Sequence, residues 1–527
     1  MLLAELLKRS GLPFQDYSEI PNIEILGIES DSRKVKNGDL FIALEGGSTD
    51  GHDFINSAID SGAVAIIGRK NLGKLRVPYF QTDNPRKSLA FLAATLNGNP
   101  ARRLTMIGVT GTDGKTTTVN LIFNILLSCG IRAGMISTVN AVIGDEMIDT
   151  GFHVTTPDAI EIQSLLKKMV DRGITHVVLE TTSHGLDQNR VDACEFDVAV
   201  ITNITHEHLD YHGNYEGYLN AKFKLIDMLV ETHEKENGNP RVAILNQDDI
   251  SYSKINDRLG TDSYRSMNAI AYGLSDSASI RAENITNTPG ELNFDVKIFG
   301  QSFRVNSPLI GTFNVYNILA AISAAAIGLK LDIDCVINGI RSMASVPGRM
   351  EQINFGQDFT AIVDFAHTPN ALKEALQTAR QLTSGQLIVA FGSAGLRDRE
   401  KRRMMSEVSL NNADISIFTA EDPRTESLAT ILSEMADEAQ RHGGIENKNY
   451  YVIEDRGEAI RKAVNLANKG DFVMACGKGH EQSMCFGETE YPWDDRTAMR
   501  SALAEKMKLQ GPQMPWLPTQ EKKKPVN

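Results

Sequence analysis

The sequence has no long hydrophobic run, few cysteines and no excess of basic residues. No stretch of the 527 residues approaches the roughly 18 uninterrupted apolar residues of a membrane-spanning helix. The apolar run at the N-terminus contains charged residues, which a signal peptide would lack. The sequence therefore predicts a cytoplasmic protein without a membrane span.

Cysteine usage points the same way. The five cysteines are scattered, and none belongs to a Cys-x-x-Cys pair. Such a pattern excludes a disulfide-rich secreted scaffold and is typical of buried, reduced thiols in a reducing compartment. The cysteines are Cys129, Cys194, Cys335, Cys476 and Cys485.

The composition bounds the class of protein. The formal net charge of −13 argues against a surface that binds nucleic acid, because such surfaces are basic. With 42% hydrophobic and 23% charged residues, the chain is typical of soluble globular proteins. Its 527 residues exceed what one core holds, which predicts two to four domains.

The chain is organised around residues 104–118. An apolar run at 104–109 predicts a buried strand, a glycine turn follows at 111–114, and helical spacing of apolar residues follows Lys115 and Thr116. This layout is typical of a phosphate-binding loop, in which backbone N–H groups, a lysine and a hydroxyl bind phosphate and Mg²⁺. Val109 stands where the strict pattern has glycine, so an ordinary glycine turn of an α/β protein is the alternative.

Turn clusters predict the domain boundaries. Asn-Gly-Asn-Pro at 97–100 and Val-Pro-Gly at 346–348 interrupt repeated strand–helix alternation. We expect an α/β fold with a small N-terminal domain at 1–97, a central domain with a parallel sheet at 98–346, and a C-terminal Rossmann-like domain at 347–510. Residues 511–527, rich in proline and then in lysine, are expected to form a flexible tail.

Polar side chains follow two expected strands of the central domain. Glu180 ends a strand predicted at 174–179, where a Mg²⁺ ligand facing the glycine loop is expected. After a strand at 198–201 come His206, His208 and His212. Three histidines could instead bind zinc in a metallohydrolase, although the stretch contains no His-Glu-x-x-His helix; a purely structural role is a third possibility.

Further along, Asn314 and Asn317 are three residues apart, which places them on one helix face. There they could read a nucleobase edge or cap the helix. In the third domain, strands predicted at 361–363, 387–391, 415–418 and 472–475 each end in a polar turn. These turns should meet at one edge of a parallel sheet, which is where ligands bind in such folds.

Taken together, these stretches resemble the Mur ligase family, MurE type, over nearly the whole chain. The motifs that carry the resemblance are TGTDGKTT at 110–117, ETTSHGL at 180–186, HLDYHG at 208–213, Asn-x-x-Asn at 314–317, GRME at 348–351, DFAHTP at 364–369 and GKGHE at 477–481. The resemblance implies a monomeric ligase of peptidoglycan precursor synthesis that binds only small-molecule substrates, with ATP as co-substrate and Mg²⁺ as cofactor. A substrate carboxylate would be converted to an acyl phosphate, and an incoming amine would then form the amide.

The resemblance also implies roles for individual residues. Lys115, Lys222 and His208 would be catalytic, and Thr116, Glu180, His208 and Lys222, the last as a carbamate, would bind Mg²⁺. ATP would be bound by Gly111, Thr112, Asp113, Gly114, Lys115, Thr116, Thr117, Asn314, Asn317, Arg349 and Asp364. The UDP-substrate would be bound by Ser30, Thr155, Thr156, Thr182, Gln188 and Arg190. The amino acid would be bound by Arg397, Glu421, Asp422, Pro423, Arg424, Gly477 and Glu481.

Two features leave the identity of the added amino acid open. Arg424 could clamp the distal carboxylate of meso-diaminopimelate, together with Arg397. However, Asp422 replaces the asparagine usual in diaminopimelate-adding members, and with Glu421 and Glu481 it forms an acidic group that also suits lysine or ornithine. Diaminopimelate is favoured.

Three other classes of function remain alternatives. A folylpolyglutamate synthetase should lack the polar turn at 30–33, which by itself could be a plain surface loop. A sister Mur ligase should differ at the turn at 421–424. A non-enzymatic nucleotide switch would not need Glu180, His208 and Lys222 together.

Overall fold

A computed structural model describes residues 1–13, 20–46, 49–148, 156–205, 207, 209–236, 238–288 and 290–523. Of the predicted site residues, Thr155 and His208 lie outside the described residues, as does His206. By compactness the chain divides into two units. The first contains 1–282, 296–302 and 316–340, and the second contains 283–295, 303–315 and 341–527. Each unit is described by itself; the three domain boundaries proposed from the sequence stay predictions.

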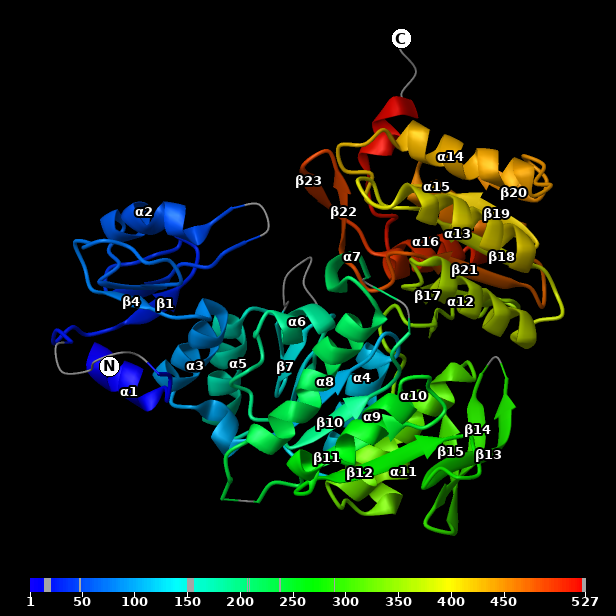
Figure 1. Cartoon of the computed structure of the whole chain (residues 1–527). Helices are drawn as coiled ribbons and strands as arrows, with labels where there is room; N and C mark the ends of the chain where they lie inside the picture. The colour runs from blue at the N-terminus through cyan, green and yellow to red at the C-terminus, as the bar shows by residue number, and fades with distance from the viewer. Residues whose placement is uncertain are drawn as a thin grey trace. The chain divides into compact units, whose positions relative to one another are not determined.

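The first unit begins with a small α/β layer, labelled in Figure 1. Its four strands lie in the order β1-β2-β3-β4 and are all parallel. Apolar side chains of β2 and β3 are buried, together with one face of α1 and α3. The elements are α1 (Leu3–Arg9), β1 (Gly27–Glu29), β2 (Asp39–Ile42), η1 (Gly51–Phe54), α2 (Ile55–Asp60), β3 (Ala65–Gly68), β4 (Tyr79–Gln81) and α3 (Pro85–Leu96).

The large sheet has eleven strands in the order β15-β14-β13-β12-β11-β10-β5-β9-β6-β7-β8. Strands β12, β11, β10, β5, β9 and β6 are parallel neighbours. The strands are β5 (Thr105–Thr110), β6 (Ala133–Ile136), β7 (Ala141–Ile143), β8 (Glu146–Ile148), β9 (His176–Glu180), β10 (Val198–Ile201), β11 (Val242–Asn246), β12 (Asn268–Gly273), β13 (Ile280–Asn287), β14 (Leu292–Ile298) and β15 (Gln301–Ser307).

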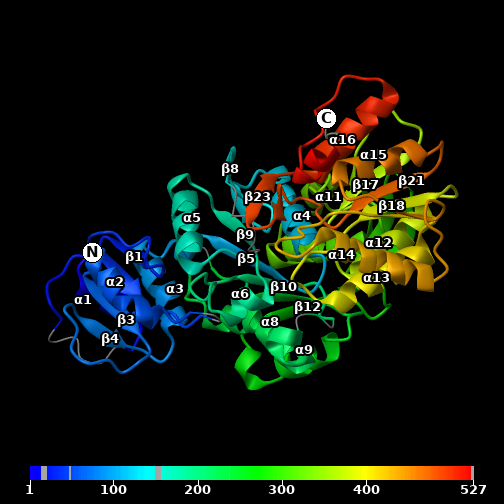
Figure 2. The ribbon, with the colours of Figure 1, turned by 90° about the horizontal axis from the view of Figure 1, so that it is seen from above.

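Helices cover this sheet, and Figure 2 gives a second view of them. They are α4 (Lys115–Ser128), α5 (Ala159–Asp171), α6 (Ser183–Asp187), α7 (Leu209–His212), α8 (Tyr215–Glu231), α9 (Tyr252–Leu259), α10 (Phe313–Ile322) and α11 (Ile333–Arg341). Short turns η2 (Pro100–Arg103) and η3 (Asp262–Tyr264) and a π-helical segment η4 (Ser323–Gly328) connect them. The predicted strands at 104–109, 174–179 and 198–201 are confirmed within one or two residues.

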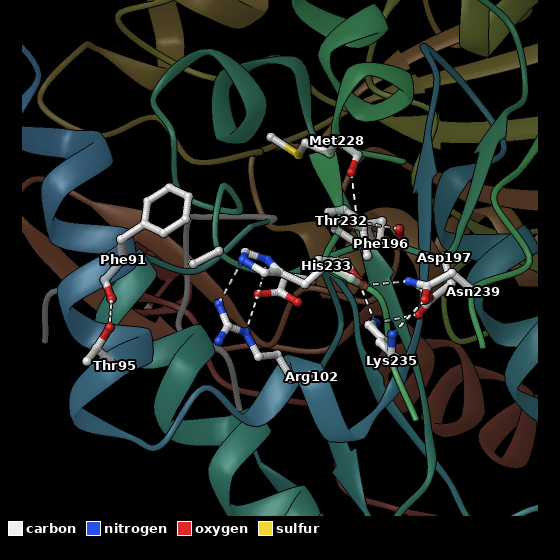
Figure 3. Close-up of polar contacts among 12 residues, drawn as sticks. Phe91, Thr95, Arg102, Phe196, Asp197, Met228, Thr232, His233, Lys235 and Asn239 are labelled. Carbon is white, nitrogen blue, oxygen red and sulfur yellow. Dashed lines mark hydrogen bonds and ion pairs between the residues drawn. The ribbon is translucent and has the colours of Figure 1, made fainter. Parts of the chain in front are cut away.

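A buried ion pair fixes the amino ends of β5 and β10 (Figure 3). Lys235 donates to Asp197 Oδ2 at 2.6 Å and to the backbone oxygen of Leu104 at 2.9 Å. The same Asp197 oxygen accepts the backbone N–H of Met106 at 2.7 Å, and Asn239 donates to the other oxygen at 3.0 Å. These bonds satisfy the polar groups at the amino ends of β5 and β10. They thereby fix the register of the two strands, whose carboxyl ends lead to the glycine loop.

The C-terminal sheet of the second unit has the order β16-β17-β21-β18-β19-β20. Strands β17, β21, β18, β19 and β20 are parallel, so the four predicted strands end at one edge, as expected. The strands are β16 (Glu351–Gln352), β17 (Thr360–Asp364), β18 (Leu387–Phe391), β19 (Ile415–Phe418), β20 (Tyr450–Val452) and β21 (Phe472–Cys476), with a hairpin of β22 (Ser483–Phe486) and β23 (Thr489–Pro492). The helices are α12 (Pro369–Leu382), α13 (Arg399–Asn412), α14 (Leu428–Arg441), α15 (Arg456–Leu466), α16 (Asp495–Met507) and η5 (Pro518–Lys523).

Two expectations from the sequence are wrong. Cys129 and Cys335 are joined by a disulfide between the end of α4 and α11, because the close packing of these helices brings together two cysteines that are 206 residues apart in the sequence. The expected flexible tail is packed at Leu517, which is buried in the C-terminal core, and at Thr519, which donates to Asp455 at 2.7 Å.

The length and hydropathy of the helices decide whether any of them could span a membrane. Within the part of the chain that the structure describes, no helix combines the length and the apolar character needed to cross a bilayer.

Candidate active site

The glycine loop lies between β5, in the middle of the large sheet, and α4. Gly114 precedes the helix with φ of 79°, and a Cβ there would lie 2.2 Å from Asn317 Oδ1. Only glycine allows both this backbone conformation and this close approach. Asn203 accepts the N–H of Asp113 at 2.9 Å and Thr202 donates to Asp113 O at 2.6 Å, so neighbouring β10 holds the loop open for an anion at the helix start.

Two lysines converge on one backbone oxygen of this loop. Lys115 Nζ donates to Gly111 O at 3.1 Å and to Thr112 O at 2.8 Å. Lys222 Nζ, from α8, donates to the same Gly111 O at 2.6 Å and lies 4.5 Å from the ring centre of Tyr218. Burial, followed by the charge of Lys115, holds the pKa of Lys222 well below its usual value. Lys222 is therefore a candidate neutral amine beside a phosphate-binding loop.

A carboxylate faces the first residues of α4, as the sequence predicts. Glu180, at the end of β9, is buried. Its Oε1 accepts the hydroxyl of Thr116 at 3.0 Å and its Oε2 accepts the N–H of Thr138 at 3.0 Å. A carboxylate and a hydroxyl are oxygen ligands of the kind that Mg²⁺ prefers, so the donor set fits that ion.

The remaining residues of the glycine loop contact α8 and the segment after β10. Thr112 Oγ1 lies 3.2 Å from the hydroxyl of Tyr218 and accepts the N–H of Thr205 at 2.9 Å. Thr117 is buried in the first turn of α4. His212 packs edge-on against the ring of Tyr211, with centroids 4.8 Å apart.

A second polar group lies beside Glu180. The hydroxyl of Thr156 lies 3.1 Å from that of Thr182 and donates to Glu180 O at 3.2 Å. Arg190 donates to Thr156 O at 2.7 Å and to Gln188 Oε1 at 2.7 Å. The four residues predicted to bind the UDP-substrate here are thus together. Ser30 lies in the N-terminal layer, where its N–H donates to Glu29 at 2.9 Å.

Of the residues predicted around the nucleotide base, Asn317 belongs to the first unit, and Asn314, Arg349 and Asp364 belong to the second. Asn314 and Asn317 are buried on α10, and the side-chain amide of Asn314 donates to Ile310 O at 2.7 Å. In the second unit, the Arg349 guanidinium stacks 4.5 Å from the ring centre of Phe365. Asp364 accepts the N–H of Met350 at 2.7 Å, and burial raises its pKa.

The carboxyl edge of the C-terminal sheet carries three acidic residues, whose charge is partly neutralised within the protein. Lys478 is buried and donates to both oxygens of Asp422 at 3.0 Å. The same ammonium pairs with Glu481 at 2.5 Å. One cation therefore serves two of the three acids that the sequence places here.

The third acid, Glu421, differs from the other two. Burial raises its pKa to about 7, and its Oε2 is buried without a hydrogen-bond partner among the described residues. A Cβ at Gly477 would lie 2.1 Å from this oxygen, so the glycine makes room for the carboxyl group. Pro423, the next turn residue but one, is buried.

The two predicted arginines follow different strands of this sheet. Arg424 is half-buried, has φ of 54°, and its side chain has no hydrogen-bond or ion-pair partner among the described residues. Its backbone N–H donates to Cys485 O at 3.1 Å, which fixes it beside β22. Arg397 is exposed.

Sequence reasoning missed Lys478 and Tyr218. Lys478 lies inside a motif whose flanking residues were selected, three residues before Glu481, and that spacing of a lysine from an acid was an available signal. Nothing in the local sequence marks Tyr218, because its contact with Thr112 joins residues 106 apart.

Three family models match the chain. A model described as "Mur ligase family, catalytic domain" matches residues 24–94, "Mur ligase middle domain" matches 109–325, and "Mur ligase, glutamate ligase domain" matches 348–479. Together they span most of the sequence.

Relatives agree over nearly the whole length. The UDP-N-acetylmuramoyl-L-alanyl-D-glutamate–2,6-diaminopimelate ligase of Geobacillus thermodenitrificans is 38% identical over 92% of this chain and 96% of its own. The UDP-N-acetylmuramyl-tripeptide synthetase of Roseiflexus sp. is 40% identical over 96% and 99%. A solved structure titled as a UDP-N-acetylmuramoyl-L-alanyl-D-glutamate–2,6-diaminopimelate ligase covers 96% of this chain and 99% of its own with a TM-score of 0.68 at 30% identity. The chain therefore belongs to the Mur ligase family, resembles its MurE type over nearly its whole length, and is an ATP-dependent ligase.

Proposed function

We propose that the protein adds meso-2,6-diaminopimelate to UDP-N-acetylmuramoyl-L-alanyl-D-glutamate in the cytoplasm, as a step of peptidoglycan precursor synthesis and thus of cell-wall growth, cell shape and division. The name of the Geobacillus relative supports this substrate. The observation that carries the choice of amino acid is the guanidinium of Arg424, which has no partner among the described residues, next to two acids that are paired with Lys478. A distal carboxylate, present in diaminopimelate and absent from lysine, satisfies that guanidinium.

The acids at this edge fit the same substrate. If Asp422 and Glu481 were unpaired, their charges would repel a distal carboxylate. Because Lys478 contacts both, this repulsion is reduced, and Glu421 is left to accept the distal ammonium. Protonation of Glu421 below a pH of about 7 would weaken that contact.

The chemistry requires two anions to approach each other. The terminal carboxylate of the dipeptide attacks the γ-phosphorus of ATP, the bond to the β,γ-bridging oxygen breaks, and ADP leaves. The amine nitrogen of the amino acid then attacks the acyl carbon, loses a proton and expels inorganic phosphate. Lys115 would exchange its two carbonyl acceptors for phosphate oxygens and stabilise the charge that develops during transfer.

Mg²⁺, when bound, would supply further charge neutralisation, and Thr116, Glu180, His208 and a carbamylated Lys222 would hold it. Carbamylation joins the Lys222 nitrogen to CO₂ with release of one proton, which needs a neutral amine. The lowered pKa of Lys222 supports this modification. A carbamate would also turn a repelling cation beside Lys115 into an attracting anion.

Lysine or ornithine is the second candidate substrate, favoured by one observation. Asp422 cannot donate a hydrogen bond to a distal carboxylate, whereas the asparagine expected in diaminopimelate-adding members can. If Asp422 governs selection, a substrate without that carboxylate is preferred.

Phosphate release from ATP tests the proposal. The protein is assayed with UDP-N-acetylmuramoyl-L-Ala-D-Glu and, separately, with meso-diaminopimelate, L-lysine and L-ornithine. Strong preference for diaminopimelate supports the role of Arg424, and preference for lysine or ornithine overturns it. Absence of release with all three would contradict the assignment to this reaction.

A further inference from the structure

Two neighbouring turns of the second unit have strained backbones. Leu396, in the turn after β18, has φ of 57°, and Asp422 and Arg424, in the turn after β19, have φ of 38° and 54°. Left-handed conformations are unfavourable for residues other than glycine and persist where surrounding contacts enforce them. The contacts that enforce these two turns therefore control where Arg397 and Arg424 are held.

Arg402 supplies the central contact. It lies on α13, its side chain is fully buried, and its two terminal nitrogens donate to the two carboxylate oxygens of Glu426 at 2.8 and 2.6 Å. This bidentate pair holds the pKa of Glu426 at about 2, so Glu426 is an anion throughout the physiological range.

Glu426 in turn bridges the two turns. Its Oε2 accepts the N–H of Leu396 at 2.9 Å, and its own N–H donates to Pro423 O at 3.1 Å. Alongside, the N–H of Gly395 donates to Asp422 O at 2.9 Å, and a Cβ at Gly395 would lie 1.9 Å from Pro423 O. Glu426 and the Gly395–Asp422 bond thus link the two turns directly.

Stability alone does not account for a guanidinium at this place. Burying a charged pair is costly, and apolar side chains of similar volume often stabilise as well or better. Arg402 Nε also lacks a hydrogen-bond partner among the described residues. An apolar residue would fill the space but could not hold Glu426.

We propose that Arg402 is a positioning residue for the amino-acid site: acting through Glu426, it sets the spacing between the turn that carries Arg397 and the turn that carries Arg424. It does not contact the substrate. This inference rests on the proposed function of the edge, and it predicts that loosening the pair affects binding of the distal carboxylate and leaves ATP binding unchanged.

The structure offers a matched pair of variants. Arg402 has a second acidic partner, Glu434 on α14, at 3.0 Å, and Glu434 also pairs with Arg399. Glu426→Ala and Glu434→Ala each remove one acidic partner of the same guanidinium, but only Glu426 contacts the turns. For Glu426→Ala we expect KM for diaminopimelate to rise about tenfold or more, equivalent to one strong contact, with KM for ATP within about twofold of wild type. For Glu434→Ala both values should stay within about twofold.

Glu426→Gln, which keeps an acceptor for the Leu396 N–H, should recover part of the affinity and replaces Glu426→Ala if the latter does not fold. Equal effects of the Glu426 and Glu434 variants on KM for diaminopimelate, or equal increases in KM for ATP and for diaminopimelate, overturn the positioning role while the ligase assignment stands.

Hydrogen exchange at the Leu396 amide separates the two proposals. If wild type shows no ligase activity, the proposed function fails, yet faster Leu396 exchange in Glu426→Ala than in Glu434→Ala still supports the bridging role. Equal exchange rates in the two variants overturn it.

Discussion

The glycine loop and the carboxyl edge of the C-terminal sheet both lie beyond the ends of parallel strands, but they treat charge differently. At the loop, Lys115 contacts only backbone oxygens, and no acidic partner of its ammonium is found among the described residues. At the C-terminal edge, Lys478 and Arg402 are each bound to two carboxylates. The cation at the glycine loop is thus available to an incoming phosphate, whereas Lys478 and Arg402 hold segments of the protein in place.

This difference separates two ways of using a buried or half-buried cation. A cation that binds a ligand must be released cheaply, which neutral carbonyl acceptors allow. A cation that positions a loop must stay in place, which bidentate carboxylate contacts ensure. Arg424, at the same edge, is more like Lys115, since no acidic partner of its guanidinium is found among the described residues.

Removing Lys115 should give the largest effect. Lys115→Ala is expected to lower kcat for phosphate release by about 10³-fold or more, because the transferred phosphoryl group loses its point charge, with a thermal midpoint close to that of wild type. The exposed Lys167, paired with Asp171, provides the control variant Lys167→Ala. Substantial ligase activity in Lys115→Ala would contradict the role of the loop.

Lys222→Ala comes next. We expect kcat to fall by about 10²-fold or more, which is the loss usual when a residue that supports a bound metal ion is removed. Added formate or acetate should restore part of the activity, because these carboxylates can replace a carbamate. Lys224→Ala is the matched control, because Lys224 lies on the same helix and pairs with Asp187. If short carboxylates give no recovery, Lys222 does not act as a carbamate.

Arg424→Ala sharpens the comparison at the other site. KM for diaminopimelate should rise about 10- to 100-fold, the loss expected for a charged hydrogen bond of about 1.5–3 kcal/mol, while KM for ATP stays unchanged. Arg403→Ala, on the exposed face of α13, serves as control. An unchanged KM for diaminopimelate would show that Arg424 acts elsewhere.

The smallest effect concerns stability and pH. Because the pKa of Glu421 is raised to about 7 from 4.5, the folded state binds more protons than the unfolded state between these values. Stability is therefore fully present below about 4.5 and declines as the pH rises to about 7. Glu421→Gln should remove this decline. The thermal midpoint of the variant minus that of wild type should therefore increase as the pH rises from 5 to about 7. Parallel profiles of the two proteins would contradict the raised pKa.

The strand ends were predictable because each is a short apolar run followed by a polar turn. That local pattern placed Glu180 at the end of one strand and Asp422 and Arg424 in the turn after another, and the parallel order within each sheet aligns such strand ends. Local pattern could not reveal which charges neutralise each other. The pairing of Asp422 with Lys478 joins residues 56 apart. It changes the expected charge of this edge, because the sequence shows three acidic residues, whereas in the folded chain one lysine is shared between two of them.

Because local sequence does not reveal contacts between distant segments, it also led to the wrong predictions for the tail and the cysteines. The packed tail depends on Leu517 meeting a core formed by β17, β21 and α15, and proline-rich composition carries no information about that contact. The pairing of Cys129 with Cys335 needs α4 and α11 to pack closely, and the Asn124 Nδ2 bond to Gly339 O at 2.6 Å and the close approach of Gly339 to α4 show this packing. Local sequence carries no information about these contacts.

The disulfide has a consequence for the unfolded chain. It closes a loop of 206 residues, and the loss of chain entropy on closing such a loop corresponds to about 5 kcal/mol. The cross-link joins the end of the helix that starts at Lys115 to the helix that precedes the last passage of the chain into the second unit. The same polypeptide thus has two different resistances to global unfolding, one with the bond and a lower one in the presence of a thiol reductant.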